Sequence, residues 1–161
     1  MKKINFLNEN DVYNELIANF PTQQAPILST DMIGLDDPER VYFFFKNKKW
    51  SEISTHLDLE NDSYALELGI SFLPEETFIY YLPLYIYASL FNRVSFWVFE
   101  SNFIQHYLCP ESQNHDNFLN FTLKFSDFQL SVIAQFMLYE SETLGFSYAK
   151  KAYQEFWVDF I

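Results

Sequence analysis

The sequence predicts an all-α protein: a mainly helical single domain over residues 1–161, with at most a minor β element. Three observations support this. No charged side chain occurs from Phe78 to Phe91. Apolar residues elsewhere recur at helical spacing behind recognisable capping residues. Only 3 glycines accompany 19 Phe, 11 Tyr and 3 Trp, which leaves few of the turns that an all-β fold needs. The length is that of one domain, which can bury roughly 70% of its unfolded surface.

The apolar segment FLPEETFIYYLPLYIYASLFN, residues 72–92, predicts the central helix. Pro74 suits a first helical turn, and the negative charges of Glu75 and Glu76 suit a helix N-terminus. The helix is expected to run to about Asn92 and to be enclosed, because it is apolar on every face. Pro83 lies inside it and predicts a kink, since an interior proline removes one backbone hydrogen bond.

Four tyrosines flank Pro83, and buried tyrosines usually find a partner for the hydroxyl. A carbonyl released by the kink is one candidate partner. Two interpretations of this helix stay open: an aromatic core helix, or the wall of a small-ligand pocket lined by Phe78, Tyr80, Tyr81 and Pro83. The uncharged run covers about 14 residues, short of the roughly 20 that span a membrane.

Shorter helices are expected before the central one. Asn10 or Asp11 caps a first helix that Pro21 closes, with one apolar face formed by Val12, Leu16 and Phe20. After a loop over 21–35, Asp37-Pro38-Glu39 predicts a second helix to about Lys46, with Val41, Tyr42, Phe44 and Phe45 inward.

A third helix is expected from Ser51 to about Asp58. The acidic segment 58–63 then predicts an exposed loop or a short acidic turn. Residues 64–70 are ambiguous, and a short helix ending at Gly69 is favoured over a strand, because glycine often follows a helix end.

After the central helix, Val94–Leu108 predicts a helix that ends at Cys109-Pro110, with an apolar stripe formed by Phe96, Phe99, Phe103, Ile104 and Tyr107. Residues 110–117 predict an exposed loop, and 118–125 a lone extended segment. Ser126 with Gln129 forms a capping box that opens a helix to about Glu142. Beyond Gly145, apolar residues at helical spacing from Ser147 predict a final amphipathic helix.

The segment FLPEETFIYYLP resembles the hallmark of a bacterial family of small proteins of unknown function, Phe-Leu-x-x-Glu-x-Phe-x-Tyr-Tyr-Leu-Pro followed by an apolar helix. The resemblance extends from about residue 17 to 142, through Phe20, Pro26, Asp36, Asp37, Glu39, Trp50 and the segment 125–140. Glu76-Thr77 departs from it, because a small residue is expected before Phe78. The resemblance implies no activity.

No residue pattern predicts catalysis, a metal or a cofactor. His106, Cys109 and His115 have a spacing like that of metal ligands, but a structural zinc site needs a fourth ligand. Cys109 and His106 are one alternative as nucleophile and base. An ordinary, partly buried thiol is the expected state of Cys109. The chain is therefore not expected to be an enzyme.

Composition also restricts location and partners. A single cysteine fits a reducing compartment, and no apolar run of signal-peptide length follows the N-terminal lysines, so a cytoplasmic protein is expected. The net charge of −12 argues against nucleic acid and against a membrane as partner.

Most of the negative charge comes from one part of the chain. Residues 51–92 contain no Lys or Arg but seven acids: Glu52, Asp58, Glu60, Asp62, Glu67, Glu75 and Glu76. Such a run is either a solvated surface or a partner-binding face for a basic protein. The second interpretation predicts a non-catalytic immunity protein that neutralises its cognate bacterial toxin, a type VI or contact-dependent effector. An enzyme or small-ligand binder that uses the tyrosine-lined pocket is the alternative.

Overall fold

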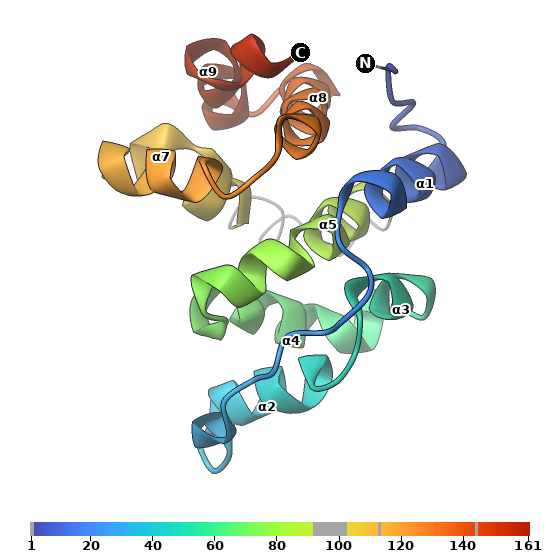
Figure 1. Cartoon of the computed structure of the whole chain (residues 1–161), viewed down its shortest axis with the longest axis vertical. Coiled ribbons are helices and arrows are strands. Elements are labelled where there is room, and N and C mark those ends of the chain that lie inside the picture. The colour runs from blue at the N-terminus through green and yellow to red at the C-terminus, as the bar shows by residue number, and fades with distance from the viewer. Residues whose placement is uncertain (1, 92–102, 113, 144) are drawn as a thin grey trace. The chain divides into compact units, whose positions relative to one another are not determined.

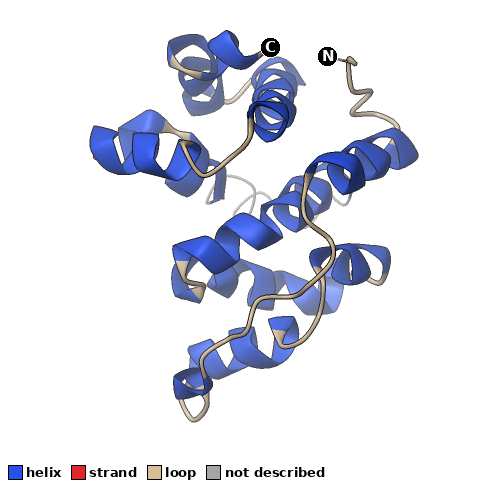
Figure 2. Cartoon of the chain, viewed as in Figure 1, coloured by secondary structure: helices blue, strands red, loops and turns tan. Residues whose placement is uncertain are grey.

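The computed structural model describes residues 2–91, 103–112, 114–143 and 145–161, and throughout these ranges the protein is all-α, as predicted, without a strand (Figures 1 and 2). The chain forms two compact units. Unit 1 comprises residues 1–19 and 103–161, and unit 2 comprises residues 20–102. That they make one domain stays a prediction.

Unit 2 carries the central helix and its neighbours. Its elements are η1 (Thr30–Met32), α2 (Asp36–Phe45), α3 (Trp50–Thr55), α4 (Leu59–Phe72) and α5 (Glu75–Phe91). Helix α2 packs on α4, and α3 packs on α5. The Trp50 indole N–H donates to the carbonyl of Pro21 at 2.8 Å, which fixes the loop that precedes α2.

Helix α5 confirms the prediction of an enclosed apolar helix, since twelve of its 17 residues are buried. The backbone N–H of Phe78 donates to the carbonyl of Pro74 at 2.8 Å, so Pro74 directly precedes the first turn. Pro83 is buried inside the helix, and a kink there stays a prediction. Asn92, the predicted end of the helix, lies outside the described residues.

Two tyrosine hydroxyls of α5 find partners on other elements rather than on a carbonyl near Pro83, whereas the buried Tyr80 hydroxyl makes no hydrogen bond within the described part of the chain. The Tyr81 hydroxyl lies 3.1 Å from the carbonyl oxygen of Phe45 and 2.8 Å from that of Lys48. The Tyr85 hydroxyl donates to the carbonyl of Leu66 at 2.8 Å. These bonds tie α5 to the C-terminal end of α2 and to α4.

The prediction of a loop at 58–63 is wrong, because α4 runs from Leu59 to Phe72. Asp58 is its N-cap, and Oδ1 accepts from the backbone N–H of Glu60 at 3.2 Å. Gly69 is not a helix end but an interior position of α4, where it lies against Phe45 and the Tyr85 hydroxyl. The acidic segment is therefore a helix start, where negative charge is favourable.

Other helix starts are shifted from their predicted positions. Asn8, not Asn10 or Asp11, caps α1 (Glu9–Asn19), and its Oδ1 accepts from the backbone N–H of Asp11 at 3.1 Å. Leu35 and Lys49 hold the N-cap positions of α2 and α3 without side-chain caps. Glutamates in the first turns reach back instead: Glu39 accepts from Gly34 N–H, and Glu52 from Lys49 N–H.

Unit 1 is arranged around α8 (Asp127–Thr143), which packs against α1, α9 (Ser147–Glu155) and η5 (Trp157–Phe160). The π-helical turn η3 (Ile104–Leu108), the short η4 (Pro110–Ser112) and α7 (His115–Thr122) complete it. The N-terminal segment joins α8 through the Gln135 side chain, whose Oε1 accepts from Ile4 N–H at 2.9 Å. Of the predicted helix Val94–Leu108, residues 94–102 lie outside the described residues.

The expected extended segment at 118–125 is also wrong. Asn114 caps α7, and Phe118, Phe121 and Thr122 are buried at helical rather than alternating spacing. The capping box of α8 is confirmed: Ser126 Oγ accepts from Gln129 N–H at 3.3 Å, and Gln129 Oε1 accepts from Ser126 N–H at 2.9 Å.

The final helix is shorter than predicted. Phe156, with φ −139° and ψ −57°, interrupts it, and η5 follows. Trp157 is fully buried, and its indole N–H donates to the carbonyl of Leu108 at 2.7 Å.

Candidate functional site

The acidic run of unit 2 is spread along three helices rather than gathered in one patch. Glu52, Asp58, Glu60 and Asp62 lie in α3 and at the start of α4, whereas Glu75 and Glu76 open α5. Helix α4 has 14 residues, so its two ends are about 21 Å apart at a rise of 1.5 Å per residue. Glu67 lies between the two groups.

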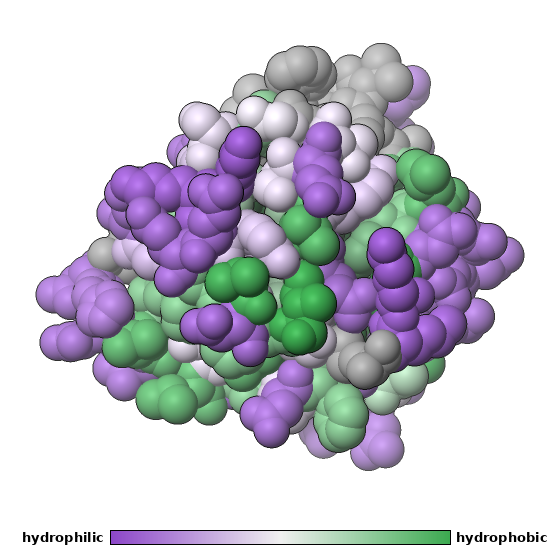
Figure 3. Space-filling view, turned by 90° about the horizontal axis from the view of Figure 1, so that it is seen from above, coloured by the Kyte–Doolittle hydropathy of each residue, from purple (hydrophilic) through white to green (hydrophobic). Residues whose placement is uncertain are grey.

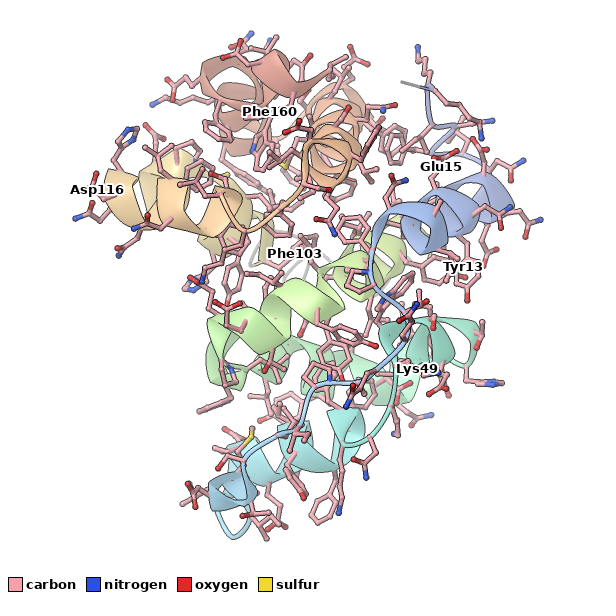
Figure 4. All side chains as sticks on the ribbon, in the orientation of Figure 1. Tyr13, Glu15, Lys49, Phe103, Asp116 and Phe160 are labelled. Atoms are coloured by element: carbon pink, nitrogen blue, oxygen red, sulfur yellow. The ribbon has the colours of Figure 1, made fainter. Side chains whose placement is uncertain are left out.

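Several of these acids have local structural roles. Asp62 Oδ2 accepts from the backbone N–H of Asp58 at 2.9 Å, and Asp58 Oδ2 accepts from the Asn61 amide at 2.6 Å. Glu52 accepts from the backbone N–H of Lys49 at 3.0 Å, where α3 begins (Figure 4). Replacing Asp58 or Asp62 would disturb the start of α4. Charge variants are therefore better made at Glu60 and Glu67.

Glu60, Tyr64 and Glu67 share the outward side of α4, because they are four and three residues apart. Tyr64 is 49% exposed. Its hydroxyl donates to Asp37 Oδ1 on α2 at 3.1 Å, and this bond raises the Tyr64 pKa. The phenol therefore stays neutral well above physiological pH and lies beside a carboxylate.

Helix α2 contributes a cation beside Tyr64 and carries a second exposed ring, that of Phe43. The Arg40 guanidinium carbon lies 5.5 Å from the centroid of the Tyr64 ring, and Arg40 Nε lies 3.8 Å from Asp36 Oδ1. Phe43, three residues after Arg40, is 56% exposed. We call these seven residues the α2–α4 surface: Asp36, Asp37, Arg40, Phe43, Glu60, Tyr64 and Glu67.

Of the seven residues of this surface, the sequence alone predicted only Glu60 and Glu67 as candidate site residues. Tyr64 and Asp37 are 27 residues apart, so their pairing could not be read from the sequence. A signal existed for Phe43, since the inward positions Val41 and Phe45 turn it outward at helical spacing. Large apolar side chains reach the surface elsewhere as well, and Figure 3 shows such residues among hydrophilic ones on one face.

The residues of the predicted tyrosine-lined pocket are engaged in packing. Phe78 and Tyr81 are fully buried. The Tyr81 ring centroid lies 4.6 Å from that of Phe45, and the Phe78 centroid 4.8 Å from that of Tyr85. Pro83 is buried. Tyr80 is buried too, and desolvation raises its pKa, with the backbone N–H of Trp50 acting in the opposite direction. These contacts favour the core interpretation.

The residues considered for metal binding or nucleophilic chemistry differ in burial. His106 and His115 are exposed, whereas Cys109 is buried with Sγ 3.8 Å from the carbonyl oxygen of Tyr148. Burial raises the pKa of the Cys109 thiol to about 12. Within the described ranges, no group of three or more His, Cys, Asp or Glu could hold a metal ion. A protonated thiol is a poor nucleophile, so this environment does not favour catalysis by Cys109.

The Cys109 environment gives a testable prediction. The thiol should resist alkylation by iodoacetamide between pH 7 and 9 in the folded chain and react quickly after denaturation, because only the thiolate attacks. Since folding raises this pKa from about 9 to about 12, the contribution of the thiol to stability should be complete below about pH 9 and decline as the pH rises toward 12. Rapid alkylation of the folded chain at pH 7 would contradict the buried, protonated state.

Comparison with known proteins places the chain in a family. Residues 31–160 match the family of unknown function DUF6714. The chain belongs to this family. No curated protein and no solved structure matches the chain.

The family match covers most of the segment in which the sequence showed a resemblance, including the helix after Pro74. Phe20 and Pro26 precede the matched residues. That the Phe-Leu-x-x-Glu-x-Phe-x-Tyr-Tyr-Leu-Pro segment marks this family stays a prediction. In the part of the chain that the structure describes, every helix is too short or too polar to cross a membrane.

Proposed function

We propose that this member of the DUF6714 family is a non-catalytic, acidic binding protein: an immunity protein that binds and neutralises a cognate bacterial toxin delivered by a type VI or contact-dependent route. It acts in the cytoplasm of the cell that makes the toxin. Its partner is a basic protein, rather than nucleic acid or a membrane.

The observation that carries this proposal is the excess of acidic side chains along α3, α4 and α5. Residues 51–91 supply seven acids and no Lys or Arg. Glu52, Asp58, Glu60, Glu75 and Glu76 are exposed, and Asp62 and Glu67 are half-buried. Lys49 Nζ lies 3.9 Å from Glu52 Oε1 and compensates one of these acids, and the remaining excess of negative charge attracts basic proteins and raises the rate of encounter. The same field repels the phosphates of nucleic acid.

The packing of the α5 tyrosines also favours binding over catalysis. Their rings contact neighbouring rings, and two hydroxyls are engaged with backbone carbonyls of α2, α4 and the loop before α3. A surface-based function leaves this core intact, whereas a ligand pocket would need it to open.

The proposal predicts that the chain protects cells against the toxin. The toxin domain encoded beside this chain's gene should stop growth when it is expressed alone in the cytoplasm, and co-expression of the full chain should restore growth. Purified chain and toxin should form a complex by size-exclusion chromatography. A chain carrying Phe78→Ala, which weakens the core, serves as the control for loss of folded protein.

Two results would overturn the proposal. One is a culture in which the toxin still stops growth although the folded wild-type chain accumulates in the cells. The other is a neighbouring gene product that is harmless in the cytoplasm and does not bind the chain.

A further inference from the structure

The α2–α4 surface combines two half-exposed aromatic rings with four carboxylates and one arginine. Tyr64 and Phe43 are 49% and 56% exposed. Aromatic residues in this setting are the usual anchors of protein interfaces, with charged residues at the rim.

Arg40 shows what this surface binds. Its guanidinium lies over the Tyr64 ring at 5.5 Å and pairs with Asp36 at 3.8 Å. A cation within about 6 Å of an aromatic face is attracted by the ring, and the flanking carboxylates add to the attraction. The Tyr64 ring and Asp36 thus hold a guanidinium, with Asp37 bonded to the Tyr64 hydroxyl, and Glu60 and Glu67 lie four and three residues from Tyr64 along α4.

The internal arginine does not block this place. The side chains of Arg40 and Asp36 are 59% and 93% exposed, and exposed ion pairs of this kind contribute little to stability. Arg40 can turn into solvent at the cost of this weak ion pair and of its contact with the Tyr64 ring, and an incoming arginine would restore both. The Tyr64 ring and Asp36 would then be open to an incoming cation, and Asp37, Glu60 and Glu67 add negative charge to the same two helices.

We propose that the α2–α4 surface is the docking site for an arginine side chain on a basic protein partner. This rests on the proposed function, in which that partner is the toxin. The arginine stacks on Tyr64 between Asp36 and Asp37 of α2 and Glu60 and Glu67 of α4. Phe43 adds apolar contact beside it. A nucleic acid does not fit, because its phosphates would meet the same four carboxylates.

Binding kinetics with the purified toxin test the site. Tyr64→Ala should weaken binding at least about tenfold, as expected for an aromatic anchor, whereas Tyr64→Phe keeps the ring and should stay within about threefold. Glu60→Gln with Glu67→Gln should slow association several-fold at low salt, with the difference shrinking at higher salt as charges are screened. The matched control, Glu142→Gln with Asp159→Asn, removes the same charge from exposed positions of unit 1.

The outcomes separate this inference from the proposed function. If the wild-type chain binds the toxin and Tyr64→Ala binds equally well, the docking site is wrong and the immunity role stands. If the control pair slows association as much as the Glu60 and Glu67 pair, only net charge matters and the site is again wrong. If the wild-type chain does not bind the toxin, the proposed function fails.

A second probe tests the surface without the toxin. A hexa-arginine peptide titrated into the isotope-labelled full chain should shift the amide resonances of residues 36–43 and 60–67, and Tyr64→Ala should reduce those shifts. A hexa-glutamate peptide should leave them unchanged. Shifts that centre on Glu75 and Glu76, or that spread evenly over all acidic residues, would overturn the assignment.

Discussion

Phe78→Ala should lower the free energy of unfolding by about 3–5 kcal/mol, the range measured when large core side chains are truncated. Phe78 is fully buried near the start of α5, and its ring centroid lies 4.8 Å from that of Tyr85. The loss combines the hydrophobic transfer energy of the ring with the cavity left behind. Urea denaturation of the wild-type and variant chains gives the value.

The matched control is Phe43→Ala, which removes the same side chain from an exposed position of α2. Because Phe43 is 56% exposed, its truncation should cost about 1 kcal/mol or less. Equal effects at the two positions, or a loss below about 1 kcal/mol for Phe78→Ala, would show that α5 is not the enclosed helix of this fold.

Gly69→Ala should destabilise the chain by about 1–3 kcal/mol, although alanine normally stabilises a helix interior relative to glycine by about 1 kcal/mol. A Cβ atom at residue 69 would overlap the Tyr85 hydroxyl and lie 3.0 Å from Cε2 of Phe45. Both rings are fully buried and have little room to move. The expected loss of stability comes from overpacking, and thermal or urea denaturation can check it.

A double-mutant cycle with Tyr85→Phe identifies the cause. Tyr85→Phe alone should cost about 1 kcal/mol, because it removes the 2.8 Å hydrogen bond to the Leu66 carbonyl. In that background Gly69→Ala should cost less, since the overlapping hydroxyl is gone. A Gly69→Ala variant as stable as the wild type would mean that α4 and α5 are not in this close contact.

The parts of the fold that the sequence predicted are those set by local signals. The uncharged run of α5 and the Ser126–Gln129 capping box each depend on neighbouring residues, and both are confirmed. Predictions failed where a local signal was weak or ambiguous. Gly69 resembled a helix end, but a glycine is needed inside α4 because Tyr85, 16 residues away, occupies the space of a side chain.

The candidate site was less predictable for the same reason. The acids of α4 could be listed, but their division into capping residues and outward residues depends on where the helix begins. Asp58 and Asp62 were expected in an exposed loop, but they make hydrogen bonds at the start of α4. Tyr64 became a candidate only when folding brought Asp37 and Arg40 of α2 beside it.

The central claim is that this chain acts by binding and not by turnover, and a titration of toxin activity with purified chain tests it most directly. Toxin held well above the dissociation constant should lose activity linearly and reach zero at one equivalent of chain, independently of incubation time. Complete loss of toxin activity at one-hundredth of an equivalent, growing with time, would contradict the claim by revealing an enzyme. Undiminished toxin activity at tenfold excess would contradict it by excluding neutralisation.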